Sequence, residues 1–273
     1  MVDRLTAYVR RGNRNVIGWL TAGAVKMICR IGHAQIEAGV QGHIAEIGVH
    51  HGRLFILLAL LARPQERSIA IDLFGQQHLN PEQSGHGDLP ALMKNCSRYA
   101  DPSAVIVHEG DSTAITSQHV MDMAGGPIRL FSIDGGHKAG VTFHDLETAE
   151  NSLAEGGVII LDDCFAEEWP DVSTGFHRFF AKPRRVVPFA TGGNKTLLTT
   201  PNAAENYKRA LVDCGTAVAE REFIGRPIYC IRFERRSFDQ RIKGLGAWNS
   251  IKDKPGIPLL RQAYRRWRFQ SGR

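Results

Sequence analysis

Apolar positions follow two different patterns along the chain, and their alternation predicts the fold class. Short runs of apolar, mostly β-branched residues are expected to be strands, at 43–49, 68–73, 104–108, 128–133 and 158–161. Helices are expected between them, at 53–61, 89–99 and 139–153. Strands that stay apolar on both faces and are separated by helices indicate a buried parallel sheet.

The pattern changes after residue 170. A helix is expected at 172–180, and the runs 186–190 and 196–200 flank a Thr-Gly-Gly-Asn turn, which is a hairpin signal. A further strand is expected at 225–233. We therefore predict an α/β fold, a Rossmann-like open, mostly parallel sheet with helices on both faces and a C-terminal antiparallel hairpin.

The same pattern divides the chain into three parts. Residues 1–41 are expected to be an N-terminal helical segment, a lid or a dimer contact, because apolar residues recur at helical spacing over 15–38. Residues 42–234 are expected to be the main domain, and 235–273 a basic tail. The polar loop at 75–88 is expected to be functional, since long loops above a parallel sheet usually are.

Composition and charge exclude several classes of protein. The five cysteines are scattered without a CxxC pair, which favours reduced thiols and a cytoplasmic location. Lys26 and Arg30 interrupt the longest apolar stretch, so no membrane span is expected. The net charge of +6 comes from the tail, where residues 232–273 hold twelve Lys or Arg against three Asp or Glu. No nucleic-acid-binding motif accompanies the tail, so no nucleic-acid partner is expected.

Residues suited to a nucleotide-like ligand follow the first three predicted strands, where open α/β sheets bind their ligands. Gly48 and Gly52 let the backbone pass close to a ligand as the next helix begins. His50 stands where a dinucleotide motif has a glycine, which disfavours a dinucleotide. Asp72 can bind both ribose hydroxyls or cap a helix. Asp111 can accept from an adenine amino group or cap the next helix.

Acidic residues also follow the fourth and fifth predicted strands. Asp134 follows one strand, and Asp162 and Asp163 end the other, so three carboxylates are expected to converge. Like charges this close destabilise one another unless a cation or a proton lies between them. Oxygen-only ligation suits Mg²⁺, with Mn²⁺ or Ca²⁺ as alternatives. The competing interpretation is that one or two of these acids only cap helices.

A base is expected beside these acids. A metal here would bind a substrate hydroxyl and lower its pKa, and the base would remove the proton. His137, three residues after Asp134, is the best placed candidate, followed by Lys138 and His144. A histidine in this position can also be a hydrogen-bonded packing residue.

At these segments the sequence resembles the class I methyltransferases. It is most similar to the metal-dependent O-methyltransferase branch and its bacterial relatives that act on sugars and macrolides. The resemblance spans about residues 42–200, and its matching segments are AEIGVHHG (45–52), IAID (69–72), IDGGH (133–137) and GGVIILDD (156–163). The E-x-G-x-x-x-G form and the 28-residue separation of Asp134 from Asp162 are typical of that branch.

The resemblance implies a cofactor, a metal and a base. S-adenosyl-L-methionine would be the cofactor, bound by Glu46, Gly48, His50, Gly52, Asp72, Asp111 and Asp134. Mg²⁺ or another divalent cation would be held by Asp134, Asp162 and Asp163. His137 would be the base in place of the lysine of the catechol-type enzymes, which argues against a catechol acceptor.

We therefore expect an S-adenosylmethionine-dependent O-methyltransferase that uses a divalent metal and a small-molecule hydroxyl acceptor, a sugar or natural product. Trp169 and the loop at 74–88 are candidates for lining the acceptor site, although Trp169 can also be a core residue. A homodimer is a further expectation. The alternatives are a metal-independent N- or carboxyl-methyltransferase, a non-catalytic nucleotide-binding protein that docks on a nucleic acid or membrane through its basic tail, and a nicotinamide oxidoreductase, which the glycine spacing disfavours.

Overall fold

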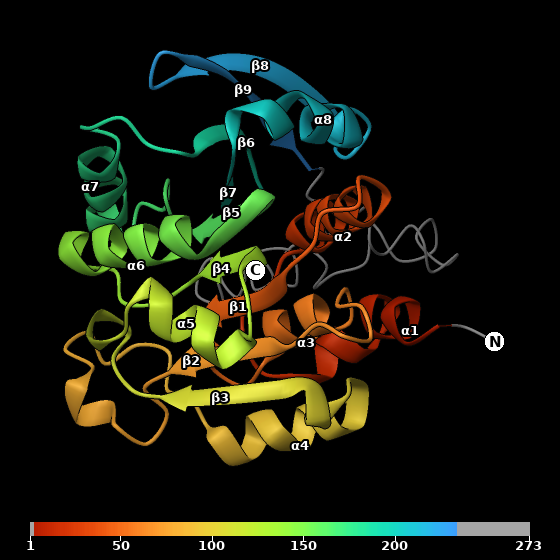
Figure 1. Cartoon of the computed structure of the whole chain (residues 1–273), viewed down its shortest axis with the longest axis vertical. Coiled ribbons are helices and arrows are strands. Elements are labelled where there is room, and N and C mark those ends of the chain that lie inside the picture. Colours follow the sequence, from red (N-terminus) through yellow and green to blue (C-terminus); the bar gives the residue numbers. More distant parts are fainter. Residues whose placement is uncertain (1–2, 234–273) are drawn as a thin grey trace, which may run out of the picture. The chain divides into compact units, whose positions relative to one another are not determined.

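The computed structural model describes residues 3–233, which contain one nine-stranded sheet flanked by helices (Figure 1). The strands are β1 His43–Ile47, β2 Ser68–Asp72, β3 Val105–Glu109, β4 Ile128–Ile133, β5 Leu153–Asp162, β6 Val187–Gly192, β7 Lys195–Thr199, β8 Ala217–Phe223 and β9 Arg226–Arg232. The α-helices are α1 Arg4–Arg10, α2 Ala22–Glu37, α3 Arg53–Ala59, α4 Leu89–Tyr99, α5 Ser117–Ala124, α6 Ala139–Ser152, α7 Pro170–Phe179 and α8 Pro201–Leu211.

The sheet has the strand order β3-β2-β1-β4-β5-β7-β6-β9-β8. The first five strands pair in parallel, and β7 runs antiparallel to both β5 and β6. β9 lies parallel to β6, and β8 pairs antiparallel with β9. The order reverses between β1 and β4, which is the switch point where open α/β sheets bind ligands. The predicted Rossmann-like sheet with antiparallel strands at its C-terminal side is confirmed.

Alternate strand residues point to opposite faces of the sheet, and helices cover both faces. Ala45 and Ile47 of β1 belong to a buried cluster that includes Leu146 of α6. Glu46, between them, points to the other face, where α3 packs on β1 and β2 and α2 packs on β5 and β6. Figure 1 shows the arrowheads of β1, β2 and β3 pointing the same way, so their carboxyl ends share one edge.

The N-terminal segment differs from its prediction. One or two helices were expected over 15–38, but α2 begins only at Ala22, because Thr21 is its N-cap and accepts from Ala24 N. Before it, Gly18 adopts a φ of +135°, which a continuing helix does not allow. Ile17 and Trp19 are 67% and 65% exposed, so the apolar spacing there does not mark a buried helix face. The shorter helix α1 carries too little apolar pattern to be recognised.

Three other elements were not expected from the sequence: α5, α8 and β8. β5 is longer than the strand predicted at 158–161. It begins at Leu153, the residue where the helix predicted at 139–153 was expected to end. The predicted hairpin is present as β6 and β7 around Gly193 and Asn194.

The composition-based expectations have different outcomes. All five cysteines are free thiols. Within residues 3–233, no helix is long and apolar enough to cross a membrane. The predicted basic tail at 235–273 lies outside the described residues.

Candidate active site

The turn after β1 is shaped by two glycines. Gly48 has a φ of +82°, and a Cβ on it would lie 1.7 Å from the carbonyl oxygen of Asp134. Gly52 has a φ of +89° and is the N-cap of α3, where a Cβ would lie 2.6 Å from Leu92. Gly48 is therefore required by the close approach of the ends of β1 and β4, and Gly52 is favoured by its positive φ. Their contact with a cofactor stays a prediction.

Asp72, at the end of β2, is buried and already accepts two backbone hydrogen bonds. His50 N donates to Oδ2 over 2.7 Å, and Phe74 N donates to Oδ1 over 3.0 Å. Burial raises the pKa of Asp72, and these hydrogen bonds offset only part of the effect. Gly87 lies against the same carboxylate, where a Cβ would be 2.5 Å from Oδ1. The loop at 75–88 therefore covers Asp72, and ribose binding there stays a prediction.

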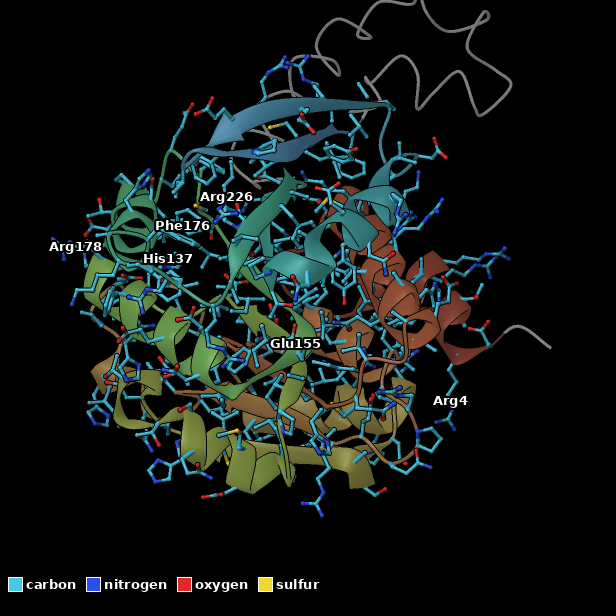
Figure 2. All side chains as sticks on the ribbon, turned by 45° about the horizontal axis from the view of Figure 1, so that its top comes forward. Arg4, His137, Glu155, Phe176, Arg178 and Arg226 are labelled. Carbon is cyan, nitrogen blue, oxygen red and sulfur yellow. The ribbon has the colours of Figure 1, made fainter. Side chains whose placement is uncertain are left out.

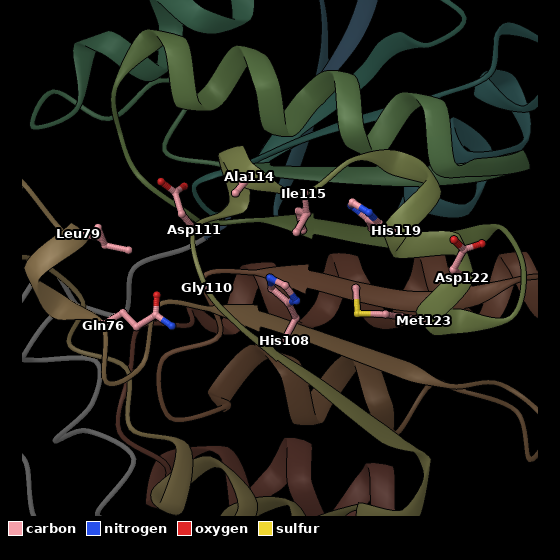
Figure 3. A pocket seen from close by; sticks show the side chains of 10 residues that line it. All are labelled: Gln76, Leu79, His108, Gly110, Asp111, Ala114, Ile115, His119, Asp122 and Met123. Carbon is pink, nitrogen blue, oxygen red and sulfur yellow. The ribbon is translucent and has the colours of Figure 1, made fainter.

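A cavity of about 550 Å³ opens beside the end of β3 (Figure 3). Asp111 lies on its wall, and Figure 3 shows it at the same end as Gln76 and Leu79. The Asp111 carboxylate accepts from Thr113 N over 2.9 Å and from Thr113 Oγ1 over 2.8 Å, so it caps the short 3-10 helix Ser112–Ala114. The capping role is thus present, while adenine recognition by Asp111 stays a prediction that this cavity leaves room for.

At the ends of β4 and β5, Asp134, His137 and Asp163 come together. Each offers one ligand atom, and these atoms lie within 4.8 Å of one another. Figure 2 shows His137 on the side of the domain opposite Arg4 of α1. Asp163 has a φ of +56°, an uncommon conformation for this residue that turns the chain sharply after Asp162. Two of the three predicted metal ligands, Asp134 and Asp163, thus lie beside the predicted base, and metal binding by them stays a prediction.

The third predicted ligand, Asp162, faces a different partner. In the antiparallel pairing of β5 with β7, Lys195 lies directly opposite Asp162, and its Nζ donates to Asp162 Oδ2 in a buried ion pair. Lys195 Nζ also lies 3.9 Å from Asp134 Oδ2. Burial lowers the pKa of Lys195, but Asp162 and Asp134 outweigh burial and hold that pKa above its ordinary value. Sequence reasoning missed Lys195, although a lysine opening a buried strand was a signal.

Glu46 belongs to the same group of charges. It is 1% exposed, and burial together with the nearby Asp134 raises its pKa well above the ordinary value. Lys195 and Ser132 act in the opposite direction. Its Oε2 accepts no hydrogen bond from the residues that the structure describes. Glu46 is therefore a buried neighbour of Asp134 and Lys195. Its contact with the cofactor stays a prediction.

His137 is held by two residues from other elements. Glu82, in the loop at 75–88, accepts from His137 N over 2.9 Å and lies 2.7 Å from Nδ1. Trp169 stacks on the ring, with centroids 3.9 Å apart and planes 15° from parallel. Nε2 lies 3.5 Å from Asp163 Oδ2. Burial lowers the pKa of His137, but Asp163 and Glu82 outweigh it, so the net pKa is raised.

Asp163 and the two alternative bases complete the site. Burial raises the pKa of Asp163, but hydrogen bonds from His137 and Asn194 outweigh it and lower the net pKa. Lys138 is the N-cap residue of α6. His144 pairs with the buried Asp145 at 3.6 Å. Of the two candidate histidines, His137 belongs to the group formed with Asp134 and Asp163.

The fold and the site together define a class of protein. A parallel sheet that reverses between β1 and β4, with acidic residues at the carboxyl ends of successive strands, is typical of α/β enzymes that bind a nucleotide-like cofactor at that edge. Residues 45–164 match the family model described as a methyltransferase domain. Residues 45–164 are thus similar to a methyltransferase domain, in agreement with the resemblance to class I methyltransferases that the sequence motifs carry.

Solved structures agree at the level of the fold. The O-methyltransferase NovP is similar with a TM-score of 0.52 and 14% identity, covering 66% of this chain and 80% of that one. A cofactor-bound protein from MTB, Rv0187, has a TM-score of 0.50 and 18% identity, covering 73% of this chain and 90% of that one. No curated protein matches the chain.

Proposed function

We propose that this chain transfers the methyl group of S-adenosylmethionine to a hydroxyl of a sugar or natural-product acceptor. The observation that carries the proposal is the convergence of His137, Asp134 and Asp163 at the edge of the sheet, next to the switch point. The fold is shared with NovP, an O-methyltransferase. A positioned histidine beside carboxylates is suited to accept the proton of a hydroxyl.

The cavity and the acids at the ends of β2 and β3 support a proposal for where the cofactor binds. We propose that the adenine enters the cavity beside Asp111 and that the ribose hydroxyls reach Asp72. Gly87 lies against the Asp72 carboxylate, so the loop at 75–88 must shift where the ribose binds. The turn at Gly48–Gly52 would then face the methionine end. When bound, S-adenosylmethionine supplies an electrophilic methyl group on a positively charged sulfur.

His137 acts as the base in this proposal. Glu82 Oε2 lies 2.7 Å from Nδ1. Nδ1 therefore carries a hydrogen and donates a hydrogen bond to Glu82. Nε2 is then left to accept the hydroxyl proton as the acceptor oxygen bonds to the methyl carbon and the carbon–sulfur bond breaks. Trp169 stacks on the imidazole and fixes the plane of the ring. Positioning of this kind supplies much of the rate of a methyl transfer.

Assistance by Mg²⁺ or another divalent cation stays a prediction. The three-acid ligand set does not fit as predicted, because Asp162 is bound to Lys195. Asp134, His137 and Asp163 form a group that could hold a cation, and a cation there would lower the pKa of a bound hydroxyl. The ion pair of Asp162 and Lys195 favours the second candidate function, a methyltransferase that works without a divalent metal.

The proposal is tested by following labelled methyl groups from S-adenosylmethionine into a panel of sugars and phenols. We expect transfer by the wild type and a large loss with His137→Gln. Absence of transfer to every hydroxyl acceptor, together with transfer to an amine or a carboxylate, would favour the N- or carboxyl-methyltransferase. The predicted homodimer and the predicted cytoplasmic location stay predictions.

A further inference from the structure

Lys195 is placed at the acid cluster by the register of the sheet. It is the first residue of β7 and pairs with Asp162, the last residue of β5. Directly opposite residues in an antiparallel pair point to the same face and lie close enough for their side chains to meet. Glu46 points to this same face, two strands away. The Lys195 ammonium therefore lies on the same face of the sheet as Asp162 and Glu46, at the carboxyl end of β5.

The charges of the cluster are complementary to this one cation. Lys195 is 3% exposed, and the Asp162 side chain is 10% exposed. A buried ammonium needs an anionic partner, and carboxylates this close need a cation between them. Lys195 meets both needs, since Nζ binds Asp162 and lies 3.9 Å from Asp134.

The turn before Lys195 also holds Asp163, the third acid of the cluster. Asn194 Nδ2 donates to Asp162 Oδ1 over 3.1 Å and to Asp163 Oδ1 over 2.6 Å. Asp163 Oδ2 is left to face His137 Nε2 at 3.5 Å. One end of the β6–β7 hairpin thus fixes both acids of the Asp162-Asp163 pair.

We propose that Lys195 is the built-in cation of this cluster, taking at Asp162 and Asp134 the place that a divalent metal was predicted to take. Asp162 is then a partner of Lys195 and no metal ligand, and methyl transfer does not depend on added metal. The catalytic part of this inference rests on the proposed function, whereas the part that concerns metal binding does not.

The test is a calorimetric titration of Mn²⁺, and separately Mg²⁺, into the wild type, Lys195→Met and Lys195→Met/Asp162→Asn. Removing a positive charge about 4 Å from a carboxylate and freeing Asp162 should tighten Mn²⁺ binding by at least about tenfold. The double variant should lose this gain. Lys208→Met is the matched control, because Lys208 is also buried but pairs with Glu205 on α8. Equal Mn²⁺ affinity of the wild type and Lys195→Met would overturn the proposal.

A second measurement decides the question if Lys195→Met does not fold. Asp162→Asn alone should leave Mn²⁺ binding by the wild type unchanged, whether it is weak or undetectable. Loss of a clear wild-type Mn²⁺ signal in Asp162→Asn would make Asp162 a metal ligand and overturn the proposal. S-adenosylhomocysteine is titrated into the same samples. Its failure to bind the wild type would refute the proposed function, while the metal result would still judge Lys195.

If the wild type transfers methyl groups, chelator treatment gives a third readout. The rate should be unaffected by removal of divalent cations, and a rate abolished by chelator and restored by Mg²⁺ would contradict the inference.

Discussion

The imidazole of His137 is hydrogen-bonded to Glu82, which lies 55 residues earlier in the chain, with Nδ1 and Oε2 2.7 Å apart. The same carboxylate accepts from His137 N. Glu82 therefore connects the loop at 75–88 to the end of β4, and it sets which nitrogen of His137 carries the proton. The loop that covers Asp72 on one side of the site thus orients the proposed base on the other.

The first prediction concerns this pair. His137→Gln should lower kcat by about 10²–10⁴-fold, the usual contribution of a general base.

Glu82→Gln should have a smaller effect on kcat and should shift the pH profile of the rate. The rate rises as His137 loses its proton, and Glu82 raises the pKa of His137. Without Glu82 that pKa falls, so the acidic limb of kcat/KM should move to lower pH. Glu167→Gln, at an exposed position in the nearby loop, is the control, and an unmoved limb in Glu82→Gln would contradict the role of Glu82.

A second prediction concerns Gly48. A Cβ at this position would lie 1.7 Å from the Asp134 carbonyl, and the residue has a positive φ. Gly48→Ala should therefore lower the free energy of unfolding by about 3 kcal/mol or more, since the ends of β1 and β4 must move apart. Gly140→Ala is the control, because no atom lies within 4 Å of its added Cβ. That helical substitution should stabilise the domain by up to about 1 kcal/mol. Urea unfolding measures both, and equal stabilities of the two variants would count against the close approach.

A third prediction concerns a buried ion pair between β4 and the residues just before β2. Arg129 is fully buried and binds both oxygens of Glu66, over 2.9 and 2.8 Å. Burial raises the pKa of Glu66, but Arg129 and Arg63 outweigh burial and lower the net pKa. The pair therefore stabilises the fold above the ordinary pKa of 4.5 and loses this effect as the pH falls through the lower folded-state value.

Glu66→Gln measures this contribution directly. It should lower the free energy of unfolding by about 3 kcal/mol at neutral pH, and the difference from the wild type should shrink as the solution is acidified. Glu147→Gln is the control, since Glu147 pairs with Arg184 on the surface with 40% of its side chain exposed. A difference between wild type and Glu66→Gln that stays constant with pH would contradict the lowered pKa.

The sequence predicted the strands and the acids that follow them, because both depend on local order. Runs such as 128–133 and 158–161 are apolar on both faces, and parallel strands place the residues after them at one edge. The proximity of Asp134, Asp163 and His137 could therefore be predicted from the sequence. The prediction of helix over 15–21 was wrong, because apolar spacing alone does not show that Ile17 and Trp19 are exposed to solvent.

The partners of these residues could not be predicted, because they depend on long-range packing. Lys195 meets Asp162 only through the register between β7 and β5, 33 residues apart. Glu82 meets His137 only because an irregular loop folds back over the sheet edge. The glycines after β1 were interpreted as room for a ligand, and the structure adds a closer reason, the approach of Gly48 to Asp134.

Titration of S-adenosylhomocysteine into the wild type and Asp72→Asn shows directly whether S-adenosylmethionine binds at the carboxyl ends of the parallel strands. Thr113→Val, which removes a hydroxyl bonded to Asp111, reports on the adenine end in the same experiment. We expect binding of one molecule per chain and a loss of about tenfold or more in affinity with Asp72→Asn, since this substitution removes the carboxylate proposed to bind both ribose hydroxyls. No binding by the wild type, or equal binding by Asp72→Asn, would contradict this expectation.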